Sequence, residues 1–155
     1  MSLHRWSLVN DRGLVVHCSG SPTTTTLEVI EGWHRENGWR CSTSGVSCGY
    51  HYVIQKGGVV RKGRPDHAIG AHVAGFNTGR LGICVTGSPA KGKPWDPEEE
   101  RALVLLLTDL CRAYRLDSSA VVGHCELDPK GKPDCPGVDM DYYRERVAQR
   151  LAITP

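Results

Sequence analysis

The sequence predicts a single α/β domain in which helices flank a central mixed β-sheet. Three observations indicate this class. A chain of 155 residues is long enough for one domain with a hydrophobic core. Its hydrophobic fraction of 39% and charged fraction of 23% are typical of a soluble globular protein. Segments of strand length and of helical periodicity follow one another in the order β-α-β-β-β-α-β-α, without an internal repeat or linker. We therefore expect one domain over residues 1–155, with its core at about 14–151.

Five short segments rich in apolar, aromatic or β-branched residues predict the strands of the sheet. They are residues 14–18, 49–54, 59–61, 81–85 and 120–123. A turn at residues 10–13 precedes the first strand, and Lys56-Gly57-Gly58 predicts a hairpin between the second and third. Successive side chains of a strand point to opposite faces, so His17 and Cys18 diverge. We place His17 toward a functional site and Cys18 in the core.

Three segments with apolar residues three and four positions apart predict helices. They run from about 27 to 37, from 96 to 115 and from 140 to 151. The second is the best defined, because Asp96 can cap it and Pro97 can occupy its first position. Residues 63–80 are expected to form a loop, and long loops in compact domains usually have a functional role.

Charge and hydropathy argue against several classes of protein. The net charge of +2 and the pI of about 8.2 are too mild to indicate a nucleic-acid-binding protein. The longest apolar run, residues 102–107, is much shorter than a membrane span, and the N-terminus lacks the apolar segment of a signal peptide. We therefore expect a protein without membrane insertion that stays in a cytoplasm until it is released. We also expect it to be a monomer.

The seven cysteines do not indicate a disulfide framework or a structural zinc site. None of them has the C-x-x-C spacing of zinc ribbons or thioredoxin-like sites, and no secretion signal is evident. Cys84 and Cys111 lie in apolar patterns and are expected to be buried. Cys41 and Cys48 flank a polar loop and could form a disulfide in an oxidising compartment, although free thiols are favoured.

A candidate metal site is formed by His17, His124 and Cys135. His124 follows a predicted strand, and Cys135 lies eleven positions later in a rigid Asp-Cys-Pro-Gly turn. Each of these residues alone would more often be structural, but the apolar run before His17 does not need a histidine at its end. Imidazole and thiolate are the ligands that zinc prefers, and three protein ligands leave one position open, as in catalytic zinc sites. We predict a zinc centre of this kind.

Six short motifs occur in the order of a known family. They are Leu14-Val15-Val16-His17-Cys18-Ser19, Gly49-Tyr50-His51-Tyr52-Val53-Ile54, Gly70-Ala71-His72-Val73-Ala74-Gly75-Phe76-Asn77, Leu81-Gly82-Ile83-Cys84, Gly123-His124 and Cys135-Pro136-Gly137. Together they resemble the zinc N-acetylmuramoyl-L-alanine amidases of the phage T7 lysozyme and peptidoglycan-recognition-protein type, over about residues 14 to 151. The resemblance implies hydrolysis of the amide that joins the lactyl group of N-acetylmuramic acid to L-alanine of the stem peptide. It also implies a central mixed sheet with helices on both faces.

The resemblance assigns roles to individual residues. His17, His124 and Cys135 resemble the ligands of one zinc ion per chain. Tyr50 resembles the active-site tyrosine of the family and Lys132 its lysine. Tyr50 could orient water or donate a hydrogen bond to the tetrahedral oxyanion, which Lys132 could also stabilise.

The spacing before the last ligand departs from the family pattern. Family members tend to place the lysine two residues before the final ligand, whereas Lys132 lies three before Cys135 and two before Asp134. Some cytosolic wall-recycling members use an aspartate followed by Pro-Gly as the third ligand. We favour Cys135 over Asp134, because thiolate suits zinc and the Pro-Gly turn follows the cysteine directly. Lys130 is the alternative to Lys132.

Several aromatic and polar residues have two alternative interpretations. His72 and Asn77 lie in the family-like loop and could line the substrate groove, although hydrogen bonding within the loop explains them equally well. His34 is expected to be a core histidine. Three tryptophans could stack on sugar rings, but a core position is expected for each: Trp33, Trp39 and Trp95.

Three functions are compatible with these residues. The first is a phage or prophage endolysin that cleaves the host cell wall, and the second is a cytosolic amidase that recycles soluble muropeptides. The third is a non-catalytic peptidoglycan-binding module on the same fold, a class that lacks a full ligand set. The complete ligand set together with Tyr50 favours catalysis. We predict an endolysin that acts on peptidoglycan or muropeptides, without a nucleic-acid partner and without a separate wall-binding domain.

Overall fold

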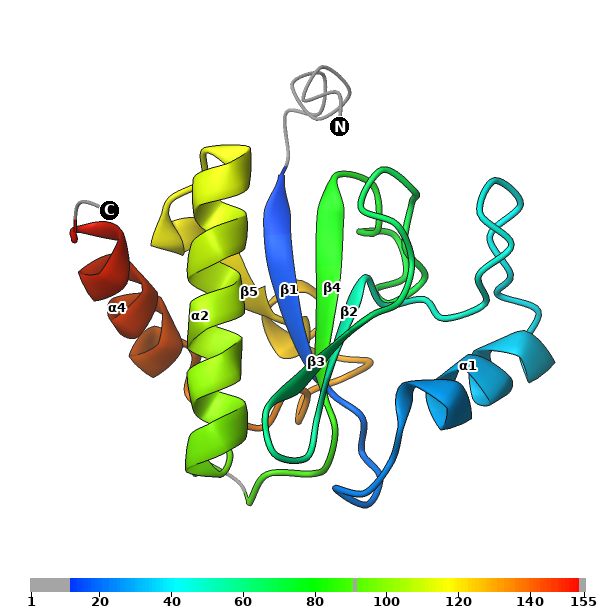
Figure 1. The fold of residues 1–155 in the computed structure, drawn as a ribbon, viewed down its shortest axis with the longest axis horizontal. Helices are drawn as coiled ribbons and strands as arrows, with labels where there is room; N and C mark the ends of the chain where they lie inside the picture. The colour runs from blue at the N-terminus through cyan, green and yellow to red at the C-terminus, as the bar shows by residue number, and fades with distance from the viewer. Residues whose placement is uncertain (1–11, 91, 154–155) are drawn as a thin grey trace.

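The computed structural model describes residues 12–90 and 92–153, so the first half of the turn predicted at residues 10–13 lies outside the described part (Figure 1). The elements along the chain are β1 (Gly13–Cys18), α1 (Leu27–Glu36), β2 (Tyr52–Gln55), β3 (Val59–Lys62), β4 (Arg80–Val85), α2 (Pro97–Tyr114), the 3-10 helix η2 (Ser118–Ala120), β5 (Val121–Gly123), α3 (His124–Leu127) and α4 (Met140–Leu151). None of the described helices is both long and apolar enough to cross a membrane.

The strands form one five-stranded mixed sheet in the order β3-β2-β4-β1-β5. β1 lies between β4 and β5 and is parallel to both, and β2 is parallel to β4. β3 is antiparallel to β2 through the predicted hairpin, in which Gly57 and Gly58 adopt left-handed φ angles of 79° and 75°. The mixed sheet predicted from the sequence is confirmed.

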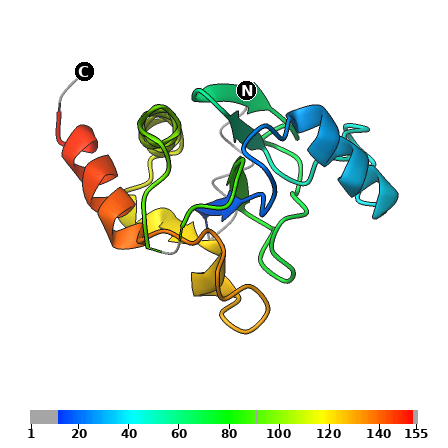
Figure 2. The same cartoon turned by 90° about the horizontal axis from the view of Figure 1, so that it is seen from below.

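Helices cover the two faces of the sheet unequally. Figure 2 shows α2 and α4 on one side and α1 on the other. The α2 side holds the larger core, in which Leu14 and Val16 of β1 pack with Leu103 and Leu107 of α2. A smaller cluster on the other side joins Ile30 of α1 to strand residues. Because side chains alternate along a strand, His17 lies on the face that α1 covers only in part.

The structure differs from the predicted elements at three places. The second strand begins at Tyr52 rather than at residue 49, because Gly49 leaves the sheet to pair with the loop: its carbonyl accepts a hydrogen bond from the Ala71 N–H at 3.0 Å. A Cβ atom on Gly49 would lie 2.0 Å from the Ala71 carbonyl oxygen. Two short helices, η2 and α3, were not predicted, since three or four residues are too few to give a periodic signal.

Candidate metal centre and substrate cavity

Two histidines are brought together by the parallel pairing of β1 with β5. Val16 is in register with Gly123, so His17 near the end of β1 and His124 directly after β5 are neighbours at the same edge of the sheet. His124 begins α3, whose first turn is held by the Glu126 carboxylate, which accepts a hydrogen bond from the Gly123 N–H at 2.7 Å. The Arg144 guanidinium of α4 binds the same carboxylate through two hydrogen bonds of 2.9 Å. The short helix is therefore fixed to the body of the domain.

The turn at Cys135 folds back onto the start of α3. The Cys125 N–H donates a hydrogen bond to the Cys135 carbonyl at 2.7 Å. Gly123 permits this close approach, because a Cβ atom there would lie 2.8 Å from Cδ of Pro136. The ten residues between His124 and Cys135 thus form a closed excursion that returns the Cys135 thiol to the His124 ring.

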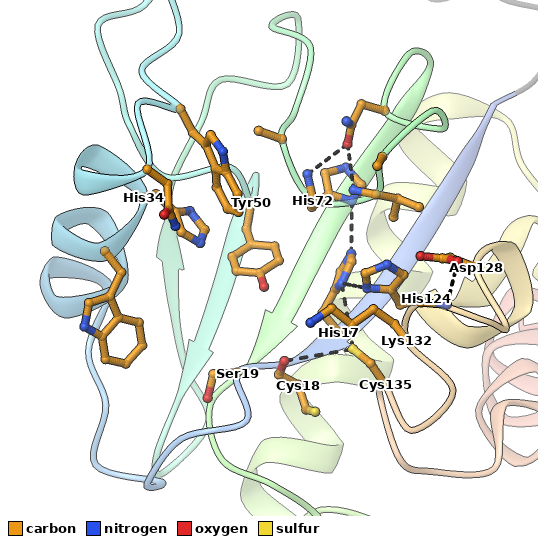
Figure 3. Close-up of a pocket in the computed structure, with 18 of the residues that line it drawn as sticks. His17, Cys18, Ser19, His34, Tyr50, His72, His124, Asp128, Lys132 and Cys135 are labelled. Carbon is orange, nitrogen blue, oxygen red and sulfur yellow. Dashed lines mark hydrogen bonds between the residues drawn. The ribbon is translucent and has the colours of Figure 1, made fainter.

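The three candidate ligands converge as a tight group (Figure 3). Nδ1 of His17 lies 3.0 Å from Nδ1 of His124 and 4.0 Å from Sγ of Cys135, and one ligand atom from each residue lies within 4.8 Å of the others. Tetrahedral zinc bonds of about 2.0–2.1 Å to nitrogen and about 2.3 Å to sulfur would place two nitrogens about 3.3 Å apart and a nitrogen and a sulfur about 3.6 Å apart. The group therefore fits a metal ion of this size. Asp134 is exposed and lies outside the group.

Burial sets the protonation of the candidate ligands. It lowers the pKa of His17 well below its ordinary value, and the neighbouring imidazoles of His72 and His124 lower it further. Burial likewise lowers the pKa of His124. Both rings are thus neutral at pH 7, which is the form that binds metals. A hydrogen bond with Cys18, together with burial, raises the pKa of the Cys135 thiol, so a bound cation would have to displace its proton.

The second nitrogen of His17 also has a partner in the protein. Its Nε2 atom lies 3.0 Å from Nδ1 of His72, and burial lowers the pKa of His72 to about 3. Nε2 of His72 is buried without a hydrogen-bond partner of standard geometry among the described residues, although the Arg80 backbone acts to raise the His72 pKa. Asn77 accepts hydrogen bonds from the N–H groups of His72 and Val73, each at 2.8 Å. His72 and Asn77 line the cavity, but Nδ1 of His72 and Oδ1 of Asn77 bind other groups of the protein, and a contact with substrate stays a prediction.

The metal-ligand group lies on the floor of a cavity of about 740 Å³. Tyr50 lines it, with its ring centroid 5.0 Å from that of His17 and its hydroxyl directed into the cavity (Figure 3). A tyrosine hydroxyl is protonated at neutral pH, and burial raises the pKa of Tyr50 further above its ordinary value. The hydroxyl can therefore donate a hydrogen bond. Lys132 also lines the cavity, and its charge contributes to the lowered pKa of both His17 and His124. Lys130 is exposed and does not line the cavity.

The α1 side of the cavity is lined by aromatic side chains, a feature that was not predicted from the sequence. Trp33 is 42% exposed and Trp39 is 44% exposed, and both line the cavity, so the expectation of a core position is wrong for them. Trp95, at 7% exposed, is in the core as expected. Helical periodicity places Ile30 of α1 inward and leaves Trp33 on the cavity side, whereas Trp39 lies beyond the helix, where periodicity carries no information. His34 is buried as expected but also lines the cavity, and its Nδ1 accepts a hydrogen bond from the Gly49 N–H at 2.8 Å.

Comparisons with known proteins agree with this geometry. Residues 9–138 match the family model of N-acetylmuramoyl-L-alanine amidases. The chain belongs to this amidase family. It is 34% identical to an endolysin of Klebsiella phage KP32, over 86% of this chain and 85% of that protein, and 32% identical to the endolysin of Escherichia phage T7 over the same shares. A solved structure of an endolysin N-acetylmuramoyl-L-alanine amidase from Clostridium intestinale superposes with a TM-score of 0.72 at 26% identity, covering 94% of this chain and 86% of that one.

One buried arginine of this amidase, also missed from the sequence, holds the cavity wall together. Arg64 is 4% exposed, and its guanidinium donates to the carbonyls of Trp39, Cys48 and Ile69 at 2.5, 2.9 and 2.7 Å. It thereby joins the segment that carries Trp39 to the loop that leads to His72. An arginine in a loop gives no sequence signal of burial, because arginine is mostly exposed in proteins.

Arg64→Met should destabilise the amidase by at least about 2 kcal/mol, since several buried carbonyls lose their donor at once. Urea unfolding of the purified protein measures this change. Arg35→Met, at an exposed position of α1, is the matched control and should leave the unfolding midpoint unchanged. Equal midpoints for the two variants would show that the guanidinium does not stabilise the wall.

Proposed function

We propose that this amidase is a zinc-dependent endolysin that hydrolyses the bond between N-acetylmuramic acid and L-alanine in peptidoglycan. The observation that supports it most is the convergence of His17, His124 and Cys135 within 4.8 Å on the floor of a cavity that Tyr50 and Lys132 also line. The endolysin relatives match this chain over most of both lengths, which supports the same role here. Residence in a host cytoplasm before release, the monomeric state and the lack of a nucleic-acid partner remain predictions.

The chemistry follows from the residues around the group. A zinc ion held there would act as a Lewis acid that polarises the amide carbonyl and lowers the pKa of water. The Tyr50 hydroxyl, which is protonated at neutral pH, donates a hydrogen bond to the carbonyl oxygen as that oxygen becomes negative. The Lys132 ammonium at the rim of the cavity adds positive charge beside the same oxygen.

The aromatic wall suits the glycan part of the substrate. Trp33 and Trp39 are partly exposed and line the same cavity as Lys132. Flat apolar faces of this kind pack against the apolar faces of sugar rings. The wall and the metal-ligand group together would therefore hold the muramic acid beside the amide that is cleaved.

Metal analysis of the purified protein should find about one zinc ion per chain, as three converging protein ligands imply. His17→Ala and Cys135→Ser should lose both the zinc and the release of stem peptides from purified sacculi. Asp134→Asn is the matched control and should keep both. Retention of zinc by Cys135→Ser, with its loss in Asp134→Asn, would transfer the third-ligand role to Asp134. Activity on soluble muropeptides but not on sacculi would instead indicate a recycling amidase.

Tyr50→Phe should lower kcat by about 10²–10³-fold, the usual cost of one lost oxyanion donor. Its zinc content should equal that of the unaltered protein, because the Tyr50 hydroxyl is not part of the metal-ligand group. Parallel kinetics and metal analysis separate the two effects. An unchanged kcat would exclude the hydroxyl from transition-state stabilisation.

Lys132→Met should reduce kcat by at least about tenfold, since a charge beside the developing oxyanion is lost. Lys130→Met provides the control, because Lys130 lies on the same excursion outside the cavity. Steady-state kinetics on sacculi at matched zinc content compares the two. A larger loss in Lys130→Met would assign the family lysine to Lys130.

A further inference from the structure

We infer that His72 is the positioning residue of the zinc ligand His17, through a hydrogen bond that fixes the tautomer and orientation of the His17 ring. This inference rests on the proposed zinc site. Nε2 of His17 lies 3.0 Å from Nδ1 of His72, and the two rings meet edge to face, with their centroids 5.0 Å apart and their planes at 88° (Figure 3). The sequence suggested that His72 contacts the substrate, but that role would not require a hydrogen bond between His72 and His17.

The direction of the hydrogen bond follows from the chemistry of the ligand. Nδ1 of His17 faces Nδ1 of His124 and Sγ of Cys135, so it is the atom that would bind the metal. A neutral imidazole that binds a metal through Nδ1 carries its proton on Nε2. His17 must then donate, and Nδ1 of His72 must accept. Metal-bound histidines are commonly oriented by such an acceptor.

Two glycines provide the space in which the His72 ring lies. A Cβ atom on Gly82 would lie 2.6 Å from Cγ of His72, and one on Gly70 would lie 2.5 Å from its Cδ2. Neither glycine has a left-handed φ angle, so the backbone conformation does not require glycine at either position. The ring of His72 excludes a side chain at Gly82, and it does so at Gly70 together with the ring of His51, whose Cε1 atom would lie 2.9 Å from the added Cβ.

Hydrogen bonds also fix the backbone around this ring. Asn77 accepts from the N–H groups of His72 and Val73. On the other side, the buried ring of His51 accepts a hydrogen bond from the Gly82 N–H at 3.0 Å through Nδ1 and contacts the Ala68 carbonyl at 2.9 Å through Nε2. The His72 ring is thus held in place before any metal or substrate binds, as an orienting residue requires.

The test compares zinc affinities of full-length variants, measured by competition with a chelator in the absence of substrate. His72→Leu removes the acceptor, whereas His72→Asn can keep an oxygen near the position of Nδ1. His72→Leu should bind zinc about 10–100-fold more weakly, the usual cost of losing an outer-shell partner. His72→Asn should recover most of the affinity. His67→Leu, at an exposed position of the same loop, should bind zinc as the unaltered protein does.

The outcomes separate this inference from the proposed function. Tight zinc binding by both the unaltered protein and His72→Leu would overturn the positioning role and leave the zinc site intact. A raised KM with unchanged zinc affinity would instead make His72 a substrate contact. Equal weakening in the Leu and Asn variants would assign His72 to packing. An unaltered protein that binds no zinc would overturn the proposed function itself.

A second measurement needs no variant and covers the case in which His72→Leu does not fold. Proton–nitrogen correlation spectra of the zinc-loaded protein report which ring nitrogens carry protons. They should show His17 protonated at Nε2 and His72 unprotonated at Nδ1. The opposite tautomer of His72 would overturn the inference.

Discussion

The site depends on the parallel pairing of β1 with β5. This pairing sets Val16 beside Gly123, and the next residue of each segment is a histidine of the metal-ligand group. A shift of one residue in β1 would turn His17 to the α2 face of the sheet and bring Cys18 into its place. The hydrophobic core prevents such a shift, because Leu14 and Val16 would leave their contacts with α2. The packing of one face of the sheet thus fixes the chemistry on the other.

Burial of several imidazoles at this edge has a cost that hydrogen bonds and a metal ion can offset. A buried polar ring is unfavourable unless its nitrogens are paired. Both nitrogens of His51 are paired with backbone groups, and Nε2 of His17 is paired with His72. Nδ1 of His17 and Nδ1 of His124 instead face each other at 3.0 Å with the Cys135 thiol nearby. A cation bound between these atoms would stabilise the folded protein, because a ligand that binds the folded state and not the unfolded state favours folding.

The parts that could be predicted from the sequence are those with a local signal. The strand that carries His17, the hairpin at Gly57-Gly58 and the helix begun at Pro97 follow from periodicity and turn chemistry. The order of the motifs identified the family, and with it the candidate ligands. The choice between Cys135 and Asp134 could not be settled by spacing, because it depends on how the excursion after His124 folds back.

The features that escaped prediction depend on contacts between distant segments. Trp33 and Trp39 are large apolar side chains of the kind usually found in a core. They are instead partly exposed to the cavity, which lies where α1 leaves the sheet partly uncovered. Arg64 is buried because several carbonyls of other segments converge on it. His72 could be assigned to the substrate groove from its motif, but its contact with His17 spans 55 positions of the chain.

A crystal structure of the zinc-loaded protein, with diffraction data collected at the zinc absorption edge, would show directly whether the three residues bind one metal ion. We expect one anomalous peak about 2.0–2.1 Å from Nδ1 of His17 and of His124 and about 2.3 Å from Sγ of Cys135. A peak bound by Asp134 or by His72, or no peak beside His17, would contradict it.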